Sequence, residues 1–527
     1  MKTFVPLVLL LAVAITVNAQ KEGLNAIGQN DLKAYMSFFA SDELKGRETG
    51  TPANDVAALY IKTNLMRLGL KPMPGTGDYL QKIPMVSGKI DRKETYLEAN
   101  DANGQVMLKS DSVFILQPVS ESMTVSGNVV FIGYGYQNGE TGYDDLKGLD
   151  LKDKIVLVMT RNPEMVKDGK TIKFINNEME MAKMNAIFSQ QPKALLYVYD
   201  PANSVRDFYH SGFADLIPAS FTSLKDDSPE QQPGDFLFLF INQHTADGLL
   251  KPTGLNLAQM QEKINSTGKP VSEEVKDLTV TLRVGLERDD FTACNVVGMI
   301  EGSDPVLKNE CVVYTAHFDH EGVDEKGEVY NGADDNASGS MGLLEIAEAF
   351  NNLKNKPLRS IVFAWVNGEE KGLLGSQFYT EHPVFPMKNT LVDINLDMIG
   401  RSVMPSDTGT FHGFKLDVSQ PKEILIYTAH ESNELTGMLM AAAREAGVTV
   451  KDMGPQIEVG TSDHACFTAK GVPAFCFNSG IHSDLHTIRD DIDKIDFDKM
   501  ERVSKMAFLL GYKAANQKKR ITVDNPQ

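Results

Sequence analysis

The chain has 527 residues, of which 42% are hydrophobic and 23% are charged, a composition typical of a folded globular protein. This length exceeds what one ordinary hydrophobic core accommodates, so two domains, or one domain with a large insertion, are expected. The formal net charge of -19 repels nucleic acid and anionic membrane surfaces, which argues against a nucleic-acid partner.

The N-terminus predicts a secretory signal peptide at residues 1–19. Lys2 precedes an apolar run from Phe4 to Val17, and the compact residues Val17 and Ala19 stand three and one before a cut after Ala19. The run is shorter than the roughly 20 residues that cross a bilayer, and no later segment is long and apolar enough. We therefore expect an exported protein, periplasmic or secreted, with no membrane span.

Residues 23–117 begin with helical patterns. A short helix is expected from Asp31 to Phe39. Thr51 is a suitable N-cap before Pro52, and the helical pattern that follows ends at Gly69. We assign this segment to the first part of a domain that the C-terminal half completes.

Residues 118–262 read as an inserted, mainly β domain of ordinary domain size. Its apolar runs are short, rich in β-branched residues and separated by glycine-rich turns, with one Met-rich helix around Asn176 to Gln190. The predicted strands are 128–132, 154–158, 194–198 and 236–241. Few titratable side chains in this block have the spacing of metal ligands.

From 279 to 516 predicted strands alternate with predicted helices. This alternation is typical of an α/β fold with a mostly parallel sheet flanked by helices. The predicted strands are 295–300, 311–316, 360–366, 391–396, 423–428 and 472–477, and the helices are 337–352, 372–381, 433–446 and 499–515. The tail at 517–527 is polar and is expected to fray.

Four cysteines occur: Cys294, Cys311, Cys466 and Cys476. None forms a Cys-x-x-Cys pair, so a zinc site built from thiolates is not expected. The spacing leaves two alternatives open, a disulfide between Cys466 and Cys476 or four free buried thiols.

Histidine and carboxylate side chains follow the predicted strands of the C-terminal half. They are His317, Asp319, Asp335, Glu369, Glu370, Asp397 and His486. Ligands of open α/β sheets bind at the carboxyl ends of the strands. Taken alone, each residue has a structural interpretation: Asp335 could cap a helix, and Glu369-Glu370 could be a solvated first turn. Together they predict a metal site, because carboxylates packed at one sheet edge repel one another without a cation.

These residues also resemble the di-zinc aminopeptidases of peptidase family M28. The resemblance rests on ordered motifs that cover nearly the whole chain after the signal peptide. They are His317-x-Asp319, Asn331-Gly-Ala-Asp-Asp335-Asn-Ala-Ser-Gly339, Asn367-Gly-Glu-Glu370, Asn395-Leu-Asp397-Met-Ile-Gly400, Ser462-Asp463-His464, His486-Thr487 and, near the N-terminus, Gly46-Arg47-x-Thr49-Gly50-Thr51-Pro52. The inserted block, with Gly142-Tyr143-Asp144-Asp145, looks like the protease-associated (PA) domain of some members.

The resemblance implies a zinc-dependent exopeptidase that removes the N-terminal residue of peptide substrates. It implies two Zn²⁺ per chain bridged by Asp335, with a cis peptide bond between Asp335 and Asn336. One ion would be completed by His317 and Asp397, and the other by Glu370 and His486. Glu369 would be the general base, and Asp319 would orient His317.

Five other residues near these motifs are not implied to be ligands. Asp463, His464 and Arg401 are candidate pocket residues, although Arg401 could instead form an ion pair. His320 and His482 flank the implied ligands, and the family pattern does not require them as ligands.

The residues bear differently on the other functions that this scaffold could serve. The same metal centre would suit a carboxypeptidase or a dipeptidase. The cyclising relatives that make pyroglutamate with one zinc are disfavoured, because the Glu369-Glu370 pair and both histidines are intact. A binding or receptor protein on an inactive peptidase scaffold predicts missing ligands, and none is missing. The side-chain preference, the oligomeric state and the native metal are not readable from the sequence, and cobalt or manganese would suit similar ligands.

Overall fold

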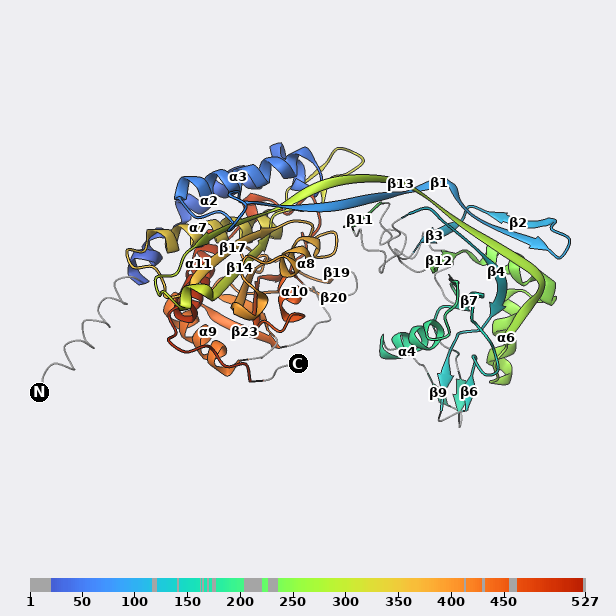
Figure 1. Cartoon of the computed structure of the whole chain (residues 1–527). Helices are drawn as coiled ribbons and strands as arrows, with labels where there is room; N and C mark the ends of the chain where they lie inside the picture. The colour runs from blue at the N-terminus through green and yellow to red at the C-terminus, as the bar shows by residue number, and fades with distance from the viewer. Residues whose placement is uncertain are drawn as a thin grey trace, which may run out of the picture. The chain divides into compact units, whose positions relative to one another are not determined.

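The structure of the protein is a computed structural model (Figure 1). It describes residues 20–115, 121–139, 142–161, 163, 165–167, 170–172, 177–202, 220–225, 236–411, 414–428, 432–454 and 462–524. The predicted signal peptide at 1–19 lies outside these ranges. The chain divides into two compact units: the first contains Met1–Met85 and Phe291–Gln527, and the second contains Val86–Asp290.

The first unit is built on a mostly parallel sheet. Neighbouring strands run parallel throughout its centre, and the pairs β22 with β24 and β17 with β13 are antiparallel. The strand order is β23 (Thr449–Gly454), β22 (Glu423–Thr428), β24 (Ala474–Asn478), β18 (Thr390–Leu396), β14 (Cys311–His317), β17 (Ser360–Val366) and the C-terminal part of β13 (Glu273–Ile300). The α/β prediction with a mostly parallel sheet is therefore confirmed for this unit.

Alternating side chains of the central strands enter two different cores. In β14, Tyr314 and its alternate neighbours belong to one buried cluster, while Cys311 and Val313 belong to another. A strand buried on both faces is expected to be apolar throughout, and all seven residues of β14 are buried. Helices that contribute to the first cluster are α2 (Gln29–Phe39), α3 (Pro52–Leu68), α7 (Gly339–Asn352), α9 (Asn433–Ala446) and α11 (Phe497–Ala515).

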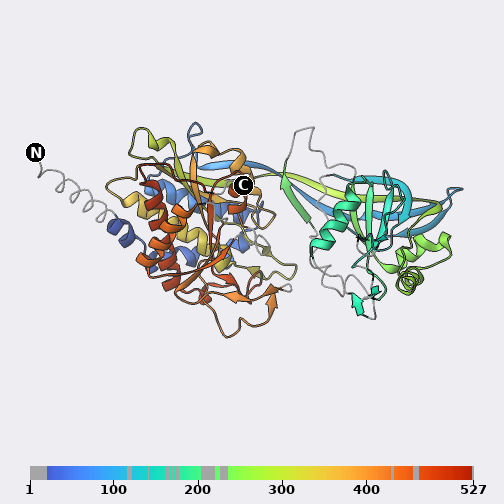
Figure 2. The ribbon, with the colours of Figure 1, turned by 90° about the horizontal axis from the view of Figure 1, so that it is seen from below.

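The other face of the sheet carries two shorter helices. Tyr379 of α8 (Leu374–Glu381) and Phe467 of α10 (His464–Thr468) are buried in the second cluster. Helix α10 contacts both β18 and β24. On the first face α11 packs along α9, and Figure 2 shows the red C-terminal helix beside the orange one. The sheet is thus covered on both faces, and the ends of its strands remain available for a site.

Helix α3 begins and ends where the sequence predicts. The Thr51 hydroxyl accepts a hydrogen bond from the Asn54 amide, Pro52 occupies the first turn, and Gly69 ends the helix in the left-handed conformation. Glycine adopts the positive φ at this position readily, because it has no Cβ.

The second unit contains its own strands and helices. Strands β4 (Met123–Phe131), β7 (Ile155–Met159), β10 (Ala194–Val198) and β12 (Leu237–Ile241) run parallel in this order. Its other strands of three or more residues are β1 (Leu80–Asp101), β2 (Val106–Ser110), β3 (Val113–Ile115), β8 (Met165–Lys167), β9 (Lys170–Ile172), β11 (Ser220–Leu224) and the N-terminal part of β13, and its helices are α4 (Asn177–Phe188), α5 (Gln243–Leu250) and α6 (Leu257–Thr267).

The second unit is longer than the segment 118–262 that composition predicts. Strands β1 and β13 each contain residues of both units, so the boundary falls within continuous strands. A strand that continues through a boundary produces no shift in composition, and the sequence pattern could not reveal it. The assignment of this unit as a PA-type domain stays a prediction.

Two further sequence-based alternatives are addressed by the structure. All four cysteines are free, so the described residues contain no disulfide between Cys466 and Cys476. Among the described residues, no helix is long and apolar enough to cross a membrane.

Candidate metal centre

Polar side chains from three neighbouring parallel strands gather at one edge of the sheet. His317 is the last residue of β14, Glu369 and Glu370 come shortly after β17, and Asp397 directly follows β18. Because parallel strands end at the same edge, residues separated by as many as 80 positions in sequence become neighbours. This is the arrangement that the strand pattern predicts.

Asp335 reaches this edge from the turn that precedes α7. Residues Ala333–Ser338 form a π-type turn with a cis peptide bond between Asp335 and Asn336, as the family resemblance implies. The Asp490 carboxylate accepts hydrogen bonds from the amides of Asp334 and Asp335, at 3.0–3.1 Å and 3.0 Å. The Asn336 side chain donates to the Leu396 carbonyl at 2.9 Å, which ties the turn to the end of β18. The turn also explains why α7 begins at Gly339 rather than at the predicted Ala337.

Asp335 lies between two imidazoles. Its Oδ1 is 3.3 Å from His317 Nε2, and its Oδ2 is 3.0 Å from His486 Nε2. A second carboxylate flanks each histidine: Asp397 Oδ1 is 3.4 Å from His317 Nε2, and Glu370 Oε2 is 3.2 Å from His486 Nε2. We call His317, Asp335 and Asp397 the first donor group, and Asp335, Glu370 and His486 the second donor group.

The carboxylates of the cluster favour positive charge on the two histidines. Burial opposes the imidazolium of His317, but the charge of Glu369 and contacts with Asp335 and Asp397 raise its pKa well above the ordinary value. In the same way Glu370 and Asp335 outweigh burial and raise the pKa of His486 to about 12. Burial favours the neutral acid at Asp335, yet the contacts with His317 and His486 hold its pKa well below the usual range. The carboxylates thus hold protons on both imidazoles, and bound cations would replace those protons.

The donor set fits zinc. Neutral imidazole nitrogen and carboxylate oxygen are ordinary zinc ligands, and four-coordinate sites use them without thiolates. Within the described residues, donor atoms of His317, Asp335 and Asp397 lie within 4.8 Å of one another, as do those of Glu321, Glu370 and His486. The first and second donor groups share one short carboxylate, Asp335, whose two oxygens face different histidines.

Glu369 and Asp319 lie beside the first donor group. Donor atoms of Glu369, His317 and Glu370 all lie within 4.8 Å. Burial and the charge of Glu370 raise the pKa of Glu369 well above its ordinary value, against the opposing effect of His317. Asp319 Oδ1 is 3.8 Å from His317 Nδ1 and accepts the Glu369 amide at 3.2 Å, and Thr49 donates to Asp319 Oδ2 at 3.0 Å. Asp319 therefore stands where it can orient both residues.

Arg47 belongs to the N-terminal motif that resembles the family, and the motif alone does not indicate what its side chain contacts. Its guanidinium is fully buried and donates to the carbonyls of Phe318, Asn331 and Gly332 at 2.7–3.0 Å, and to Phe39 at 2.8 Å. Arg47 thus joins the segment after His317 to the segment before Asp335. The signal in the sequence was a basic residue inside a Gly-Arg-x-Thr-Gly motif.

Of the three candidate pocket residues, Arg401 is an ion-pair residue. Its side chain is fully buried, and its Nη1 is 3.1 Å from Asp484 Oδ2. This burial places Arg401 among the charges inside the fold and not on a pocket wall. Asp463 is fully buried as well, and burial raises its pKa to about 7. His464 is partly buried, and burial lowers its pKa to about 4.

Other residues near the site are more deeply buried than their sequence context suggests. Asp334 accepts the Gly400 amide at 2.7 Å and faces His482 Nε2 at 3.4 Å, with both side chains fully buried. His320 is fully buried, and its Nδ1 is 2.7 Å from Glu370 Oε1. None of these contacts could be read from spacing, because each joins segments far apart in the chain.

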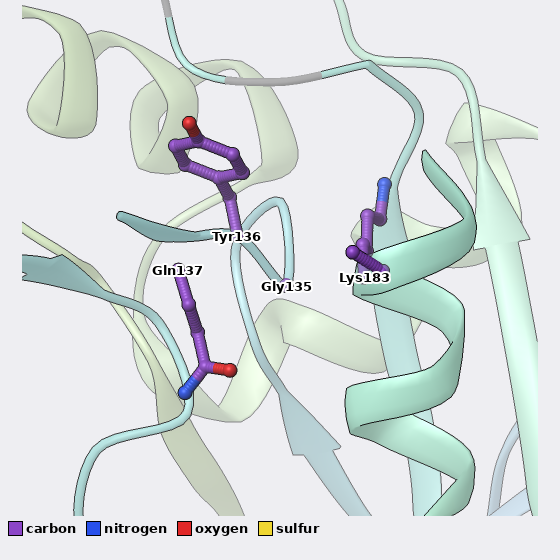
Figure 3. A pocket seen from close by; sticks show the side chains of 5 residues that line it. Gly135, Tyr136, Gln137 and Lys183 are labelled. Atoms are coloured by element: carbon purple, nitrogen blue, oxygen red, sulfur yellow. The ribbon is translucent and has the colours of Figure 1, made fainter. Parts of the chain in front are cut away.

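A separate hollow lies in the second unit. Gly135, Tyr136, Gln137, Ala182 and Lys183 line it, and Figure 3 shows the Lys183 side chain on helix α4 across from Tyr136. The Lys183 amine donates to the carbonyls of Met159 and Arg161 at 3.1 Å and 3.2 Å. Its charge is therefore engaged within the fold, and the hollow gathers no metal-type donor set among the described residues.

The fold and the site define a class: an α/β protein in which two histidines face one shared carboxylate at an edge of a mostly parallel sheet. Residues 295–510 match the sequence model of peptidase family M28. The matched segment contains the residues of both donor groups.

Individual relatives agree with the family match. Aminopeptidase YwaD of Bacillus subtilis (strain 168) is 27% identical over 273 residues, which are 49% of this chain and 54% of that protein. A probable leucine aminopeptidase of Trichophyton verrucosum (strain HKI 0517) is 28% identical over 242 residues, 44% of this chain and 61% of that protein. The matched region spans little more than half the length of these relatives.

A solved structure supports the fold. The aminopeptidase from Aneurinibacillus sp. strain AM-1 has a TM-score of 0.55 and 20% sequence identity, with 96% of this chain and 98% of that chain covered. This likeness extends over nearly the whole of both chains.

Proposed function

We propose that the protein is an exported, zinc-dependent aminopeptidase that hydrolyses the N-terminal residue of peptides. The observation that carries the proposal is Asp335, whose two oxygens face His317 and His486 at 3.3 Å and 3.0 Å. In the described residues all five implied ligands are present and converge. A binding protein on an inactive scaffold would not need to retain them.

The first donor group would hold one zinc ion and the second donor group the other. When bound, zinc lowers the pKa of water from about 15.7 toward about 7 and polarises a carbonyl, which supplies a nucleophile at neutral pH. Zinc is proposed from the imidazole and carboxylate donors, and cobalt or manganese would suit the same ligands.

Glu369 would accept and deliver the proton. Its carboxylate lies beside His317 and Glu370, where it can take a proton from water and pass it to the leaving amine. Such proton transfer contributes roughly 10² to 10⁴-fold to the rate. Asp319 would orient His317 through Nδ1 and would hold the Glu369 backbone, so it positions the base as well as a ligand.

An aminopeptidase is preferred among exopeptidases because the curated relatives carry that name. Export is proposed from the sequence of residues 1–19, with its basic start, short apolar core and small residues before the cut. The second unit is proposed to be the PA-type insertion, on the resemblance of Gly142-Tyr143-Asp144-Asp145.

The test is hydrolysis of a panel of aminoacyl chromogenic amides by the purified mature chain. Each substrate is measured before chelation, after removal of the metal, and after zinc is restored. We expect cleavage that chelation abolishes and zinc restores, and the best amide would define the preferred side chain.

N-blocked dipeptides and C-terminal substrates run in parallel distinguish the alternatives. Cleavage of these substrates, with no cleavage of any free-amino amide, would identify a carboxypeptidase or dipeptidase instead. A protein that binds no metal and cleaves nothing would identify a binding protein.

A further inference from the structure

The two residues that follow Asp319 lie against the second donor group. His320 is fully buried, and its Nδ1 is 2.7 Å from Glu370 Oε1 and 3.8 Å from Asp335 Oδ2. Its ring meets the ring of His486 edge to face, with 5.6 Å between centroids. His320 therefore contacts every member of this group.

The His320 ring is fixed by packing rather than by a second hydrogen bond. Its Nε2 is buried and has no hydrogen-bond partner among the described residues. Gly332 covers the ring so closely that a Cβ at this position, with φ of +54°, would lie 2.5 Å from the ring carbons. The close packing of Gly332 therefore holds the ring with Nδ1 facing Glu370.

Glu321 lies beside the other ligand of this group. Its Oε1 is 3.6 Å from His486 Nδ1, the ring nitrogen that faces away from Asp335. His486 needs such support more than His317 does. Its side chain is 38% exposed against 1% for His317, and it comes from a loop position with φ of +49° rather than from a strand end.

The pattern repeats the one that surrounds His317. There Nε2 faces the carboxylates of the donor group, and Nδ1 lies 3.3 Å from the Asp319 carbonyl oxygen and 3.8 Å from Asp319 Oδ1. A histidine that binds a metal commonly presents its other ring nitrogen to a carboxylate, which fixes the tautomer and the ring orientation. Residues 317, 319 and 321 therefore supply a ligand, its own orienting carboxylate, and the orienting carboxylate of the second histidine.

We propose that His320 and Glu321 are positioning residues of the second donor group. His320 holds Glu370 in place, and Glu321 orients His486. This inference rests on the proposed zinc function, because it assigns the two residues to one of two metal positions. It predicts that Asp319 affects metal binding at the first donor group, whereas His320 and Glu321 affect metal binding at the second donor group.

The experiment is a zinc titration of the full-length mature chain after chelation, followed by competition with a chromophoric chelator. The variants are His320→Ala, Glu321→Gln and Asp319→Asn. Glu325→Gln is the matched control, because Glu325 is exposed in the same segment and loses the same charge. Thermal unfolding of each metal-free variant reports whether the fold is retained, and Glu321→Asp tests rescue by a shorter carboxylate.

We expect the wild type to bind two zinc ions. His320→Ala and Glu321→Gln should each weaken one dissociation constant about 10 to 100-fold and leave the other unchanged. Asp319→Asn should weaken the opposite constant, so that the double variant Asp319→Asn with Glu321→Gln weakens both. Glu325→Gln should match the wild type, and Glu321→Asp should recover most of the lost affinity.

The inference is overturned if His320→Ala and Glu321→Gln leave both constants unchanged, or weaken both equally. Failure of the proposed function looks different, because the wild type itself would then bind no zinc or a single ion. If either variant fails to fold without metal, the other single variant and the Glu321→Asp rescue decide the outcome.

Discussion

Both units of this protein contain buried carboxylates, but the partners of these carboxylates differ. In the second unit Asp145 accepts hydrogen bonds from the amides of Tyr134 and Tyr136 and from the Tyr143 hydroxyl, at 2.8–3.2 Å. Asp200 is paired there with the Arg161 guanidinium and with Gln261. In the first unit the carboxylates of Asp335, Asp397 and Glu370 face two shared imidazoles instead.

The difference separates structural carboxylates from functional ones. A buried carboxylate that accepts hydrogen bonds from donors of its own unit stabilises the fold and needs no bound cation. Carboxylates that converge on one another raise the local demand for positive charge, which protons or metal ions must meet. Residue type alone does not distinguish the two cases, whereas the identity of the partners does.

The largest predicted effect is on the reaction. Glu369→Gln should lower kcat roughly 10² to 10⁴-fold, because the amide cannot take up the proton. The zinc content should stay at the wild-type value, since Glu369 is not in either donor group. Steady-state kinetics on the best aminoacyl amide, with zinc measured on the same sample, checks this.

Glu381→Gln, an exposed change at the end of α8, serves as its control and should leave kcat unchanged. A Glu369→Gln variant with wild-type kcat would remove Glu369 from the mechanism.

The comparison itself is tested by a pair of alanine variants. Asp335→Ala should abolish zinc binding at both positions and with it the hydrolysis. Asp145→Ala should leave zinc binding and kcat unchanged but lower the unfolding free energy of the second unit by roughly 2–4 kcal/mol, because it removes an acceptor shared by three buried donors. Zinc titration and urea unfolding of both variants provide the measurement. Loss of zinc in Asp145→Ala would erase the distinction drawn between the two units.

Arg47→Met tests whether the site depends on the carbonyls that Arg47 joins. The change leaves buried acceptors of Phe318, Asn331 and Gly332 without their donor, and each such group costs about 1–3 kcal/mol. We expect the first unit to lose roughly 3 kcal/mol of unfolding free energy. Differential scanning calorimetry measures it, with the exposed Arg67→Met as the control. Equal stability of the two variants would contradict the role assigned to Arg47.

The smallest predicted effect concerns a buried carboxyl away from the site. Glu345 on α7 is fully buried and accepts the Gly28 amide at 3.1 Å, and burial raises its pKa to about 8. The folded pKa lies above the unfolded value near 4.5, so the folded state binds more protons in between. The stabilisation is therefore fully present below pH 4.5 and is lost as the pH rises through 8.

Glu345→Gln should remove this part of the pH dependence. We expect the unfolding free energy of the wild type to fall on the order of 3 kcal/mol more than that of the variant between pH 5 and 8. Urea unfolding across this range, on metal-free protein, gives both curves. Parallel curves would show that Glu345 keeps an ordinary pKa.

Much of the first unit was predictable because its signals are local. Strand 360–366 and helix 433–446 lie where the alternation of apolar runs and caps places them. The strand ends then carry His317, Glu370 and Asp397 to one edge, since parallel strands leave no other arrangement. The start of α7 was predicted two residues too early, because the turn at Ala333–Ser338 is held by Asp490, which is about 155 residues away in the sequence.

Local sequence patterns are sufficient to predict the fold class of the first unit and the set of residues that converge at its sheet edge. Both follow from the order of strands and helices along the chain, which local hydrophobic patterns and capping residues set. The boundary of the second unit within β1 and β13, the burial of Arg47 and Asp490, and the contacts of His320 and Glu321 emerge only from the folded arrangement. Those features depend on partners brought together by folding, and no local pattern encodes which distant backbone or side chain a buried polar group meets.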